Sequence, residues 1–270
     1  MKINIGSFQI NIETSGNKDG PVVMMAHSLG CSSRMWDPQL QMLEPDFHVV
    51  RLDMRGHGLS DAPPGPYTLE QLADDVIAVM DHQKIEQAHW VGLSIGGMFG
   101  QSLLLRYPER FLSAVLCDTM SALPPGAMPL WDARIAKVEG EGLGSIKQAT
   151  LERWFTPSYL NSDDASIKAS LVSIGAQIDQ ATDSGYVACS RAITGLNYLE
   201  QIATIETRVL LIVGAEDSAT PVSASEDMNR HFPNSRLVIL EGASHISNVE
   251  KTHDFNAVLG PFLRHAAGLA

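Results

Sequence analysis

Residues 89–97 read HWVGLSIGG, and this stretch decides the fold. Its middle, Gly92-Leu93-Ser94-Ile95-Gly96, fits the pattern G-x-S-x-G, in which a serine occupies a sharp turn between a strand and a helix. The apolar run before Ser94 predicts the strand, and residues 95–106 predict the helix. Small flanking residues let neighbouring backbone approach, and the helix N-terminus favours negative charge beside the hydroxyl. Ser94 is therefore predicted to be a nucleophile rather than an ordinary turn serine.

Short apolar runs on both sides of this turn predict further strands. They are residues 22–27, 48–53, 114–118, 208–214 and 236–242, and residues 1–16 add two short strands around Gly6. Helical patterns lie between them. One has Thr68 as N-cap, Gln71 completing a capping box, and an apolar face of Leu72, Val76, Val79 and Met80. Alternating strands and helices predict a mostly parallel, doubly wound α/β sheet.

The alternation of strands and helices breaks after about residue 122. SALPPGAMPLWD is a loop rich in proline and glycine, and the residues up to about 200 carry helical patterns without a clear strand. The chain is therefore predicted to consist of an α/β core at 1–122 and 201–270, interrupted by a helical cap at 123–200.

A serine nucleophile needs a base, and four histidines lie in the last part of the chain. His245 follows the last predicted strand directly, so its loop opens at the same edge of the sheet as Ser94. His231 lies at a helix end, and His253 and His265 lie in the final helix or near the chain end. We predict His245 as the general base and the other three as surface residues.

The acid that orients this histidine should lie between the serine and the histidine in the chain. Asp217 follows the strand at 208–214 in the turn Gly214-Ala215-Glu216-Asp217, and we predict it as the acid. Adjacent Glu216 is an alternative. Asp118, at the end of the strand at 114–118, is another, although a residue there can also be a simple strand-end cap.

The oxyanion that forms during acyl transfer needs preorganised N–H donors. We predict one donor at the backbone N–H of Ile95, directly after the nucleophile. The second is predicted in the loop His27-Ser28-Leu29-Gly30, at the N–H of Leu29. His27 is expected to hold this loop through a hydrogen bond rather than to act in catalysis.

Composition limits the partners. The formal net charge of −12 disfavours binding to nucleic acid and to anionic membrane surfaces. The sequence contains no run of 18 apolar residues, the length needed to span a bilayer. The odd, sparse set of three cysteines argues against a disulfide framework, and the N-terminus lacks an apolar signal region, so we expect a cytoplasmic protein. Oligomeric state is not predicted.

The remaining motifs point to no cofactor. The run Arg55-Gly56-His57-Gly58-Leu59-Ser60 does not have phosphate-loop spacing and is expected to be a tight structural loop. No H-E-x-x-H motif, zinc-type cysteine pair or G-x-G-x-x-G after a strand is present, which argues against a metal and against a dinucleotide.

Several longer strings resemble the 3-oxoadipate enol-lactonases of the α/β-hydrolase fold family. They are HSLG, RGHGLSDAPPGPYTLEQLADDV, GLSIGGM, WDARI, LERWFTP, GAEDSATP and ASHISNVE, and the last two hold the predicted acid and base. The resemblance implies an α/β-hydrolase fold with a helical cap, a triad of Ser94, Asp217 and His245, and no cofactor. It also implies hydrolysis of 3-oxoadipate enol-lactone to 3-oxoadipate in the β-ketoadipate route of aromatic catabolism. The HSLG loop departs from the commoner HG start but keeps the backbone donor.

Other functions remain open at this point. The same triad serves carboxylesterases, other lactonases and C–C bond hydrolases, and a hydrolase-like binding protein can retain one. The cap residues also have two interpretations. Trp131, Trp154, Phe155 and Tyr159 can pack the cap or line a substrate cavity. Arg134 can hold the carboxylate of an anionic lactone, or can be a solvated residue paired with Asp132 or Glu139.

Overall fold

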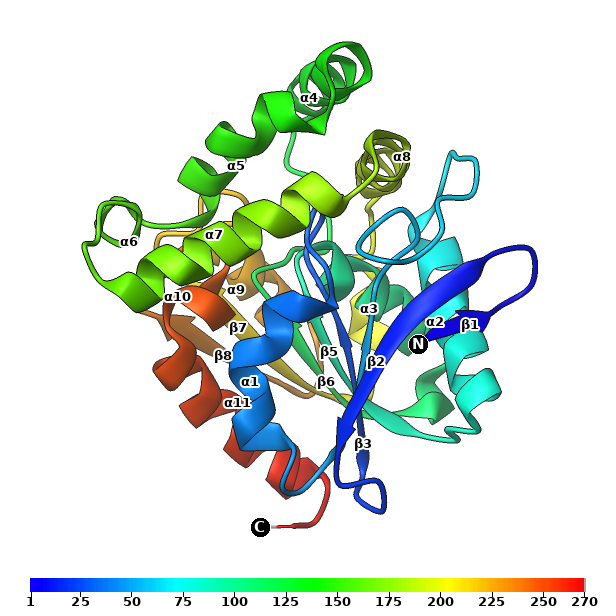
Figure 1. Ribbon diagram of the computed structural model, residues 1–270. Helices are drawn as coiled ribbons and strands as arrows, with labels where there is room; N and C mark the ends of the chain where they lie inside the picture. The colour runs from blue at the N-terminus through cyan, green and yellow to red at the C-terminus, as the bar shows by residue number, and fades with distance from the viewer. Residues whose placement is uncertain (270) are drawn as a thin grey trace.

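Strand β5 (Ala88–Leu93), which leads directly into Ser94, lies in the middle of an eight-stranded sheet (Figure 1). The computed structural model describes residues 1–269. The sheet order is β1-β2-β4-β3-β5-β6-β7-β8, antiparallel between β1, β2 and β4 and parallel from β4 through β8. The other strands are β1 (Lys2–Asn4), β2 (Gln9–Gly16), β3 (Val22–Ala26), β4 (His48–Leu52), β6 (Phe111–Cys117), β7 (Arg208–Gly214) and β8 (Ser235–Leu240). The predicted α/β fold class, a mostly parallel doubly wound sheet, is confirmed.

Helices cover both faces of this sheet. In Figure 1, α1 and α11 pack together in front of the strands, and α2 and α3 pack together behind them. The core helices are α1 (Asp37–Leu43), α2 (Leu69–Gln83), α3 (Ile95–Arg106), α9 (Val222–His231), α10 (Ser247–Glu250) and α11 (Thr252–Ala266), with 3₁₀ turns at η1 (Ser33–Trp36), η2 (Pro108–Arg110) and η4 (Gln201–Thr204). Within residues 1–269, no helix combines the length and apolarity needed to cross a membrane.

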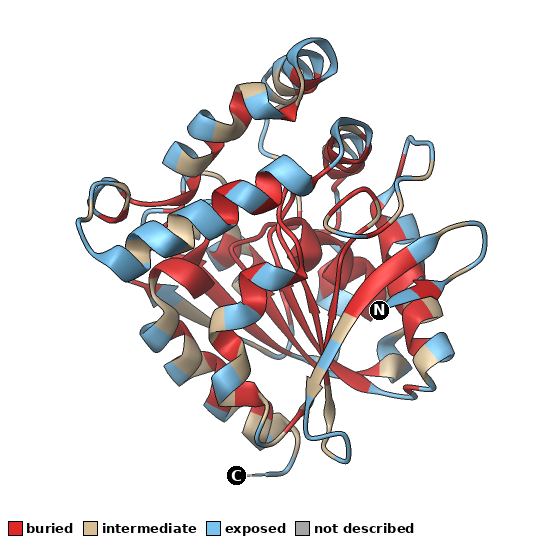
Figure 2. Ribbon diagram, in the orientation of Figure 1, coloured by how far each residue is buried: buried red, intermediate tan, exposed pale blue. Residues whose placement is uncertain are grey.

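The apolar runs that predicted strands have this composition because both faces of the sheet are covered. Every residue of β5 is buried, and Figure 2 shows the central strands as a continuous buried layer. The Trp90 ring packs edge-on against Phe99 of α3 at 5.5 Å and Phe111 of β6 at 6.1 Å between ring centroids. Burying an aromatic side chain of this size contributes about 1.5–3 kcal/mol, so β5 is well anchored beneath the turn that follows it.

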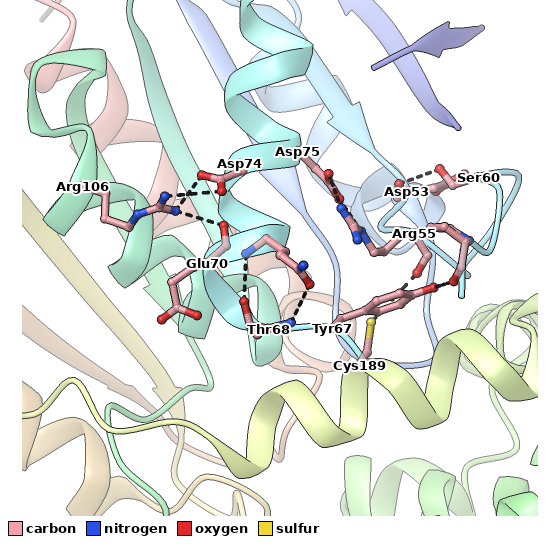
Figure 3. Close-up of polar contacts among 12 residues, drawn as sticks. Asp53, Arg55, Ser60, Tyr67, Thr68, Glu70, Asp74, Asp75, Arg106 and Cys189 are labelled. Atoms are coloured by element: carbon pink, nitrogen blue, oxygen red, sulfur yellow. Dashed lines mark hydrogen bonds and ion pairs between the residues drawn. The ribbon is translucent and has the colours of Figure 1, made fainter. Parts of the chain in front are cut away.

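Helix α2 begins as the sequence predicts. The Thr68 hydroxyl accepts from the N–H of Gln71 at 3.2 Å, and the Gln71 side chain accepts from the N–H of Thr68 at 3.1 Å (Figure 3). Its predicted apolar face of Leu72, Val76, Val79 and Met80 is buried.

Strands β3 and β4 each end one residue earlier than predicted, for the same reason. His27 and Asp53, the last residues of their apolar runs, leave β3 and β4 and use their side chains to hold neighbouring loops. The buried Asp53 carboxylate accepts from the N–H of Ser33 at 2.7 Å, the N–H of Leu59 at 2.9 Å and the amide of Asn11 at 2.9 Å. The residues that end these strands therefore position loops at the carboxyl edge of the sheet.

The segment between β6 and β7 is helical. It contains α4 (Met128–Glu141), η3 (Leu143–Ile146), α5 (Lys147–Trp154), α6 (Pro157–Leu160), α7 (Ala165–Gln180) and α8 (Asp183–Thr194), which lie above the sheet in Figure 1. An isolated bridge between Ala122 and Asn197 joins the two ends of this segment. We propose that residues 123–200 act as one cap over the carboxyl edge of the sheet.

A close backbone contact fastens α8 to the core. The N–H and hydroxyl of Thr182 both donate to the carbonyl of Gly56, at 3.0 and 3.1 Å. A Cβ on Gly185 would lie 2.4 Å from the Cα of Gly56, so neither residue can carry a side chain without moving the cap. Beside this contact, Arg55 pairs with buried Asp75 and its carbonyl faces the Cys189 sulfur (Figure 3). The glycine-rich loop at 55–60 is thus where α8 meets the core.

Candidate active site

Ser94 occupies a strained turn between β5 and α3. Its φ of 56° lies in the left-handed region, which residues other than glycine rarely adopt. A Cβ on Gly92 would lie 2.2 Å from the carbonyl oxygen of Gly96, and a Cβ on Gly96 would lie 2.6 Å from that of Ala26. Both glycines of the G-x-S-x-G pattern are therefore required for close backbone approach, and α3 can start directly against the end of β3.

Neighbouring residues hold the Ser94 backbone on both sides. Its N–H donates to the carbonyl of Cys117 at 2.9 Å, and its carbonyl accepts from the Thr119 hydroxyl at 2.8 Å. These contacts leave the hydroxyl at the floor of a cavity of about 620 Å³ between the sheet and the cap, which His245 also lines. The Ser94 hydroxyl and His245 form no hydrogen bond among the described residues; such contacts commonly tighten when a substrate binds.

His245 and Asp217 are in direct contact. Nδ1 of His245 lies 2.8 Å from a carboxylate oxygen of Asp217, and both side chains are buried. Thr220, which the sequence analysis missed, donates its hydroxyl to the same oxygen at 2.6 Å. The N–H groups of Ala219 and Thr220 donate to the other oxygen at 2.7 and 2.9 Å. The carboxylate thus accepts bonds on both oxygens and fixes the orientation of the imidazole.

This arrangement keeps Asp217 ionised. Burial alone would raise its pKa, but the nearby His245 and the hydrogen bonds from Thr220 outweigh burial and hold the pKa of Asp217 below its usual range. An ionised carboxylate at Nδ1 can stabilise the imidazolium that forms when His245 takes a proton.

The alternative acids lie elsewhere. Glu216 is exposed to solvent. Asp118 is buried with a φ of 44°, but its carboxylate accepts from the N–H of Gly214 at 2.9 Å and from the hydroxyl of Ser247 at 2.6 Å rather than from His245. Asp118 therefore joins the end of β7 to the start of α10, and so supports the two segments that carry Asp217 and His245.

The other late histidines lie away from the cavity. His231 is half-buried at the end of α9 and contacts the carbonyl of Asp227 at 2.7 Å, while His253 and His265 are exposed on α11. Their positions agree with the prediction of surface residues.

The two predicted oxyanion donors lie on either side of Ser94. Ile95 is the first residue of α3, so its N–H has no partner within the helix, and Leu29 lies in the loop after β3 and lines the cavity. Neither N–H donates to another of the described residues. Two buried, unpaired N–H groups flanking a serine can bind an oxyanion.

His27 holds the Leu29 loop, as the sequence predicts. Its Nε2 accepts from the N–H of Met54 at 3.0 Å, which leaves the proton on Nδ1, and Nδ1 donates to the carbonyl of Ser28 at 2.8 Å. The His57 ring lies 5.4 Å away, donates from Nδ1 to the carbonyl of Arg55 at 3.1 Å, and has no partner for its buried Nε2 among the described residues. Burial, and repulsion from any charge on His27, lower the pKa of His57 to about 3.

The cap supplies the opposite wall of the cavity. Trp131 and Trp154 both line it, and the Trp154 ring lies 6.2 Å from the His245 ring. Phe155 and Tyr159 do not line it; their rings stack on each other at 5.0 Å. Each interpretation of the cap aromatics therefore holds for two of them. The two tryptophans line the cavity, and Phe155 and Tyr159 pack within the cap.

Arg134 lines the same cavity and pairs with neither Asp132 nor Glu139. Its Nε donates to the Tyr186 hydroxyl at 2.6 Å and its Nη2 to the Thr150 hydroxyl at 2.7 Å. Glu139 instead pairs with Arg191. Tyr186 and Arg153, which also line the cavity, were not found from the sequence. The signal for Arg153 was its position directly before Trp154 in the LERWFTP string.

A family model of the α/β hydrolase fold matches residues 21–252. The chain belongs to this family. It is 36% identical to 3-oxoadipate enol-lactonase 2 of Acinetobacter baylyi, over 92% of this chain and 90% of that protein. The crystal structure of the enol-lactonase from Burkholderia xenovorans LB400 matches with a TM-score of 0.92 and 32% identity, over 97% of this chain and 99% of that one. The resemblance to the enol-lactonases and the prediction of a hydrolase are thus confirmed.

A third relative has another named substrate. A protein of Caulobacter sp. (strain K31) with the provisional name carbamate hydrolase RutD is 29% identical, over 91% of each chain. The family therefore fixes a hydrolase acting on a small molecule, while its substrate has to be argued from the cavity.

The buried histidines beneath the Leu29 loop predict acid sensitivity. In the unfolded chain, His57 takes up a proton below about pH 6.5, whereas in the folded protein it stays neutral down to about pH 3. The unfolded state therefore binds more protons in this window, and the free energy of unfolding should fall as pH decreases, by about 1.4 kcal/mol per pH unit for one such group. Nearby His27 adds to this effect, because burial lowers its pKa as well.

The measurement is urea unfolding of the parent protein and of His57→Asn between pH 7.5 and pH 4.5. Asparagine keeps a donor for the Arg55 carbonyl but cannot titrate, so the pH dependence should be smaller in the variant. Parallel pH curves for the two proteins would contradict this role.

Proposed function

We propose that this protein is a serine hydrolase that opens a small anionic lactone, 3-oxoadipate enol-lactone, to give 3-oxoadipate. The observation that carries the proposal is one cavity lined by Ser94, by His245 with its Asp217 partner, and by a cap arginine without a carboxylate partner among residues 1–269. The similarity to enol-lactonases supports the same substrate.

The chemistry follows from the positions of these groups. Ser94 Oγ attacks the lactone carbonyl carbon while His245 takes its proton, and the N–H groups of Leu29 and Ile95 hold the oxyanion. Collapse breaks the ring C–O bond and leaves an acyl-enzyme. The leaving enolate gains a proton and becomes a ketone, which favours ring opening. A water activated by His245 then attacks the acyl carbon, and the proton returns to Ser94 as the carboxylate product leaves.

The cap residues supply the preference for the substrate. We propose that Trp131 and Trp154 enclose the lactone ring and that Arg134 contacts its carboxylate. Because the chain carries a net charge of −12, an anionic substrate needs such a local cation. The test of the whole assignment is a hydrolysis screen over enol-lactones, simple lactones, short acyl esters and carbamates. Preference for a neutral ester or a carbamate over the anionic enol-lactone would overturn the substrate.

We also propose that the protein is located in the cytoplasm. The three cysteines, Cys31, Cys117 and Cys189, are buried and free, and burial raises the pKa of the Cys189 thiol to about 12. Unpaired, unreactive thiols fit the reducing cytoplasm.

Ser94→Ala should abolish hydrolysis of every substrate while leaving the fold and the melting temperature nearly unchanged. The reason for this expectation is the strained turn that presents the Ser94 hydroxyl to the cavity. A serine-directed phosphonate followed by peptide mass mapping identifies the nucleophile, and labelling of any other residue contradicts the assignment.

Asp217→Asn should lower kcat by on the order of 10⁴-fold, the effect of the same change in another triad, because the imidazole loses its charged partner and its tautomer. Glu216→Gln is the matched control on the exposed neighbour and should have little effect. A greater loss in Asp118→Asn than in Asp217→Asn would show that the acid has been misassigned.

Arg134→Met should weaken turnover of the anionic enol-lactone more than that of a neutral lactone of similar size. The selective loss should be on the order of 1.5–3 kcal/mol, which is the contribution of a hydrogen bond to a charged group. The measurement is kcat/KM on the two substrates. Equal losses on both would exclude contact with the carboxylate.

A further inference from the structure

A second arginine faces the cavity and has no evident role in the fold. Arg153 lies near the end of α5, directly before Trp154, and lines the same cavity as Arg134. The one hydrogen bond of its side chain is from Nη2 to the carbonyl of Ala219, at the long distance of 3.5 Å. Within residues 1–269 neither Arg134 nor Arg153 forms an ion pair with a carboxylate. Asp217, an acid whose charge reaches Arg153, is already engaged by His245 and Thr220.

Most arginines of the chain have a carboxylate partner. Arginines 34, 51, 55, 106, 110, 191, 230 and 264 each pair with an aspartate or glutamate, as expected in a protein with 31 acidic residues. Of the four without such a pair, Arg208 and Arg236 are exposed on strands of the sheet, and Arg134 and Arg153 line the cavity. Two like charges in one cavity repel each other, and a bound anion would relieve that repulsion.

The hydrogen bonds of Arg134 determine which of its nitrogens can bind a ligand. Its Nε and Nη2 are occupied by Tyr186 and Thr150, so Nη1 is left for a ligand. The Arg153 side chain has only the long contact to Ala219, so its guanidinium can turn toward a ligand. Arg134 and Arg153 line the same cavity, and Arg153 is exposed to solvent there, so a ligand can reach its guanidinium.

We propose that Arg153 is a second specificity-determining residue, which together with Arg134 makes the cavity a site for carboxylate-bearing ligands. This deepens the proposed function and rests on it for the identity of the natural substrate. One fixed guanidinium and one adjustable guanidinium bind a carboxylate more selectively than a single arginine, because Arg134 can donate from Nη1 while Arg153 adds its own charge-assisted N–H bonds. Neutral ligands of the same shape gain none of these bonds.

The experiment uses adipate, a six-carbon dicarboxylate, and its neutral diamide, adipamide, as matched probes. Inhibition constants of both are measured against hydrolysis of a neutral chromogenic ester by the full chain, and adipate binding to Ser94→Ala is measured by calorimetry. Neither readout requires turnover of an enol-lactone.

In Arg153→Gln, the inhibition constant of adipate should rise about tenfold or more relative to that of adipamide, and Arg153→Lys should recover part of the loss. A double variant with Arg134→Met should lose less than the two single losses combined, since both contact one ligand. Arg208→Gln is the control: this exposed arginine begins β7, at the opposite end of the strand from the cavity, and its change should alter neither constant.

The outcomes separate the two proposals. An unchanged ratio of the two inhibition constants in Arg153→Gln, or no adipate binding to the parent protein, overturns the role of Arg153. If Arg153→Gln loses adipate binding but the parent protein does not hydrolyse the enol-lactone, the carboxylate site stands and the proposed substrate is overturned.

Discussion

The close approach of backbone at Gly92 and Gly96 is the constraint on which the site depends. With a side chain at either position, α3 could not start against the ends of β3 and β5, because a Cβ there would fall 2.2 or 2.6 Å from a carbonyl oxygen. The strained φ of Ser94 follows from this geometry, and so does the position of the Ile95 N–H. The strain is tolerated because β5 is buried along its whole length and the Ser94 backbone is held by Cys117 and Thr119.

The remaining elements of the site are held by buried polar side chains at the same edge of the sheet. His27 and Asp53 hold the loops after β3 and β4, and Asp118 joins the end of β7 to the start of α10. Each of these groups is fully or nearly buried, so losing a partner would cost desolvation free energy that water could not restore. The edge is therefore rigid before any ligand binds, as preorganised electrostatic stabilisation requires.

The sequence predicts most of this edge because local rules govern it. The G-x-S-x-G turn, the capping box of α2 and the apolar runs of the central strands each depend on residues close together in the chain. What it misses depends on long-range packing. Thr220 reaches Asp217 through a turn that spacing alone does not reveal, and Gly185 matters only because the fold brings it against Gly56. Arg153 and Tyr186 enter the cavity from separate cap helices, and no motif places a residue in a cavity formed between helices.

The core and the cap thus present charges of opposite sign to the cavity region. The core edge presents two carboxylates that accept hydrogen bonds: Asp217 from its own loop, and Asp118 from the end of β7 and the start of α10. The cap presents two guanidinium groups that form no ion pair with a carboxylate of residues 1–269. In a chain of net charge −12, leaving two cations unpaired where a reactive serine faces them is a local reversal of the protein's field. We therefore propose that the charge of the ligand, rather than the reactivity of Ser94, is the property on which this site discriminates among esters and lactones.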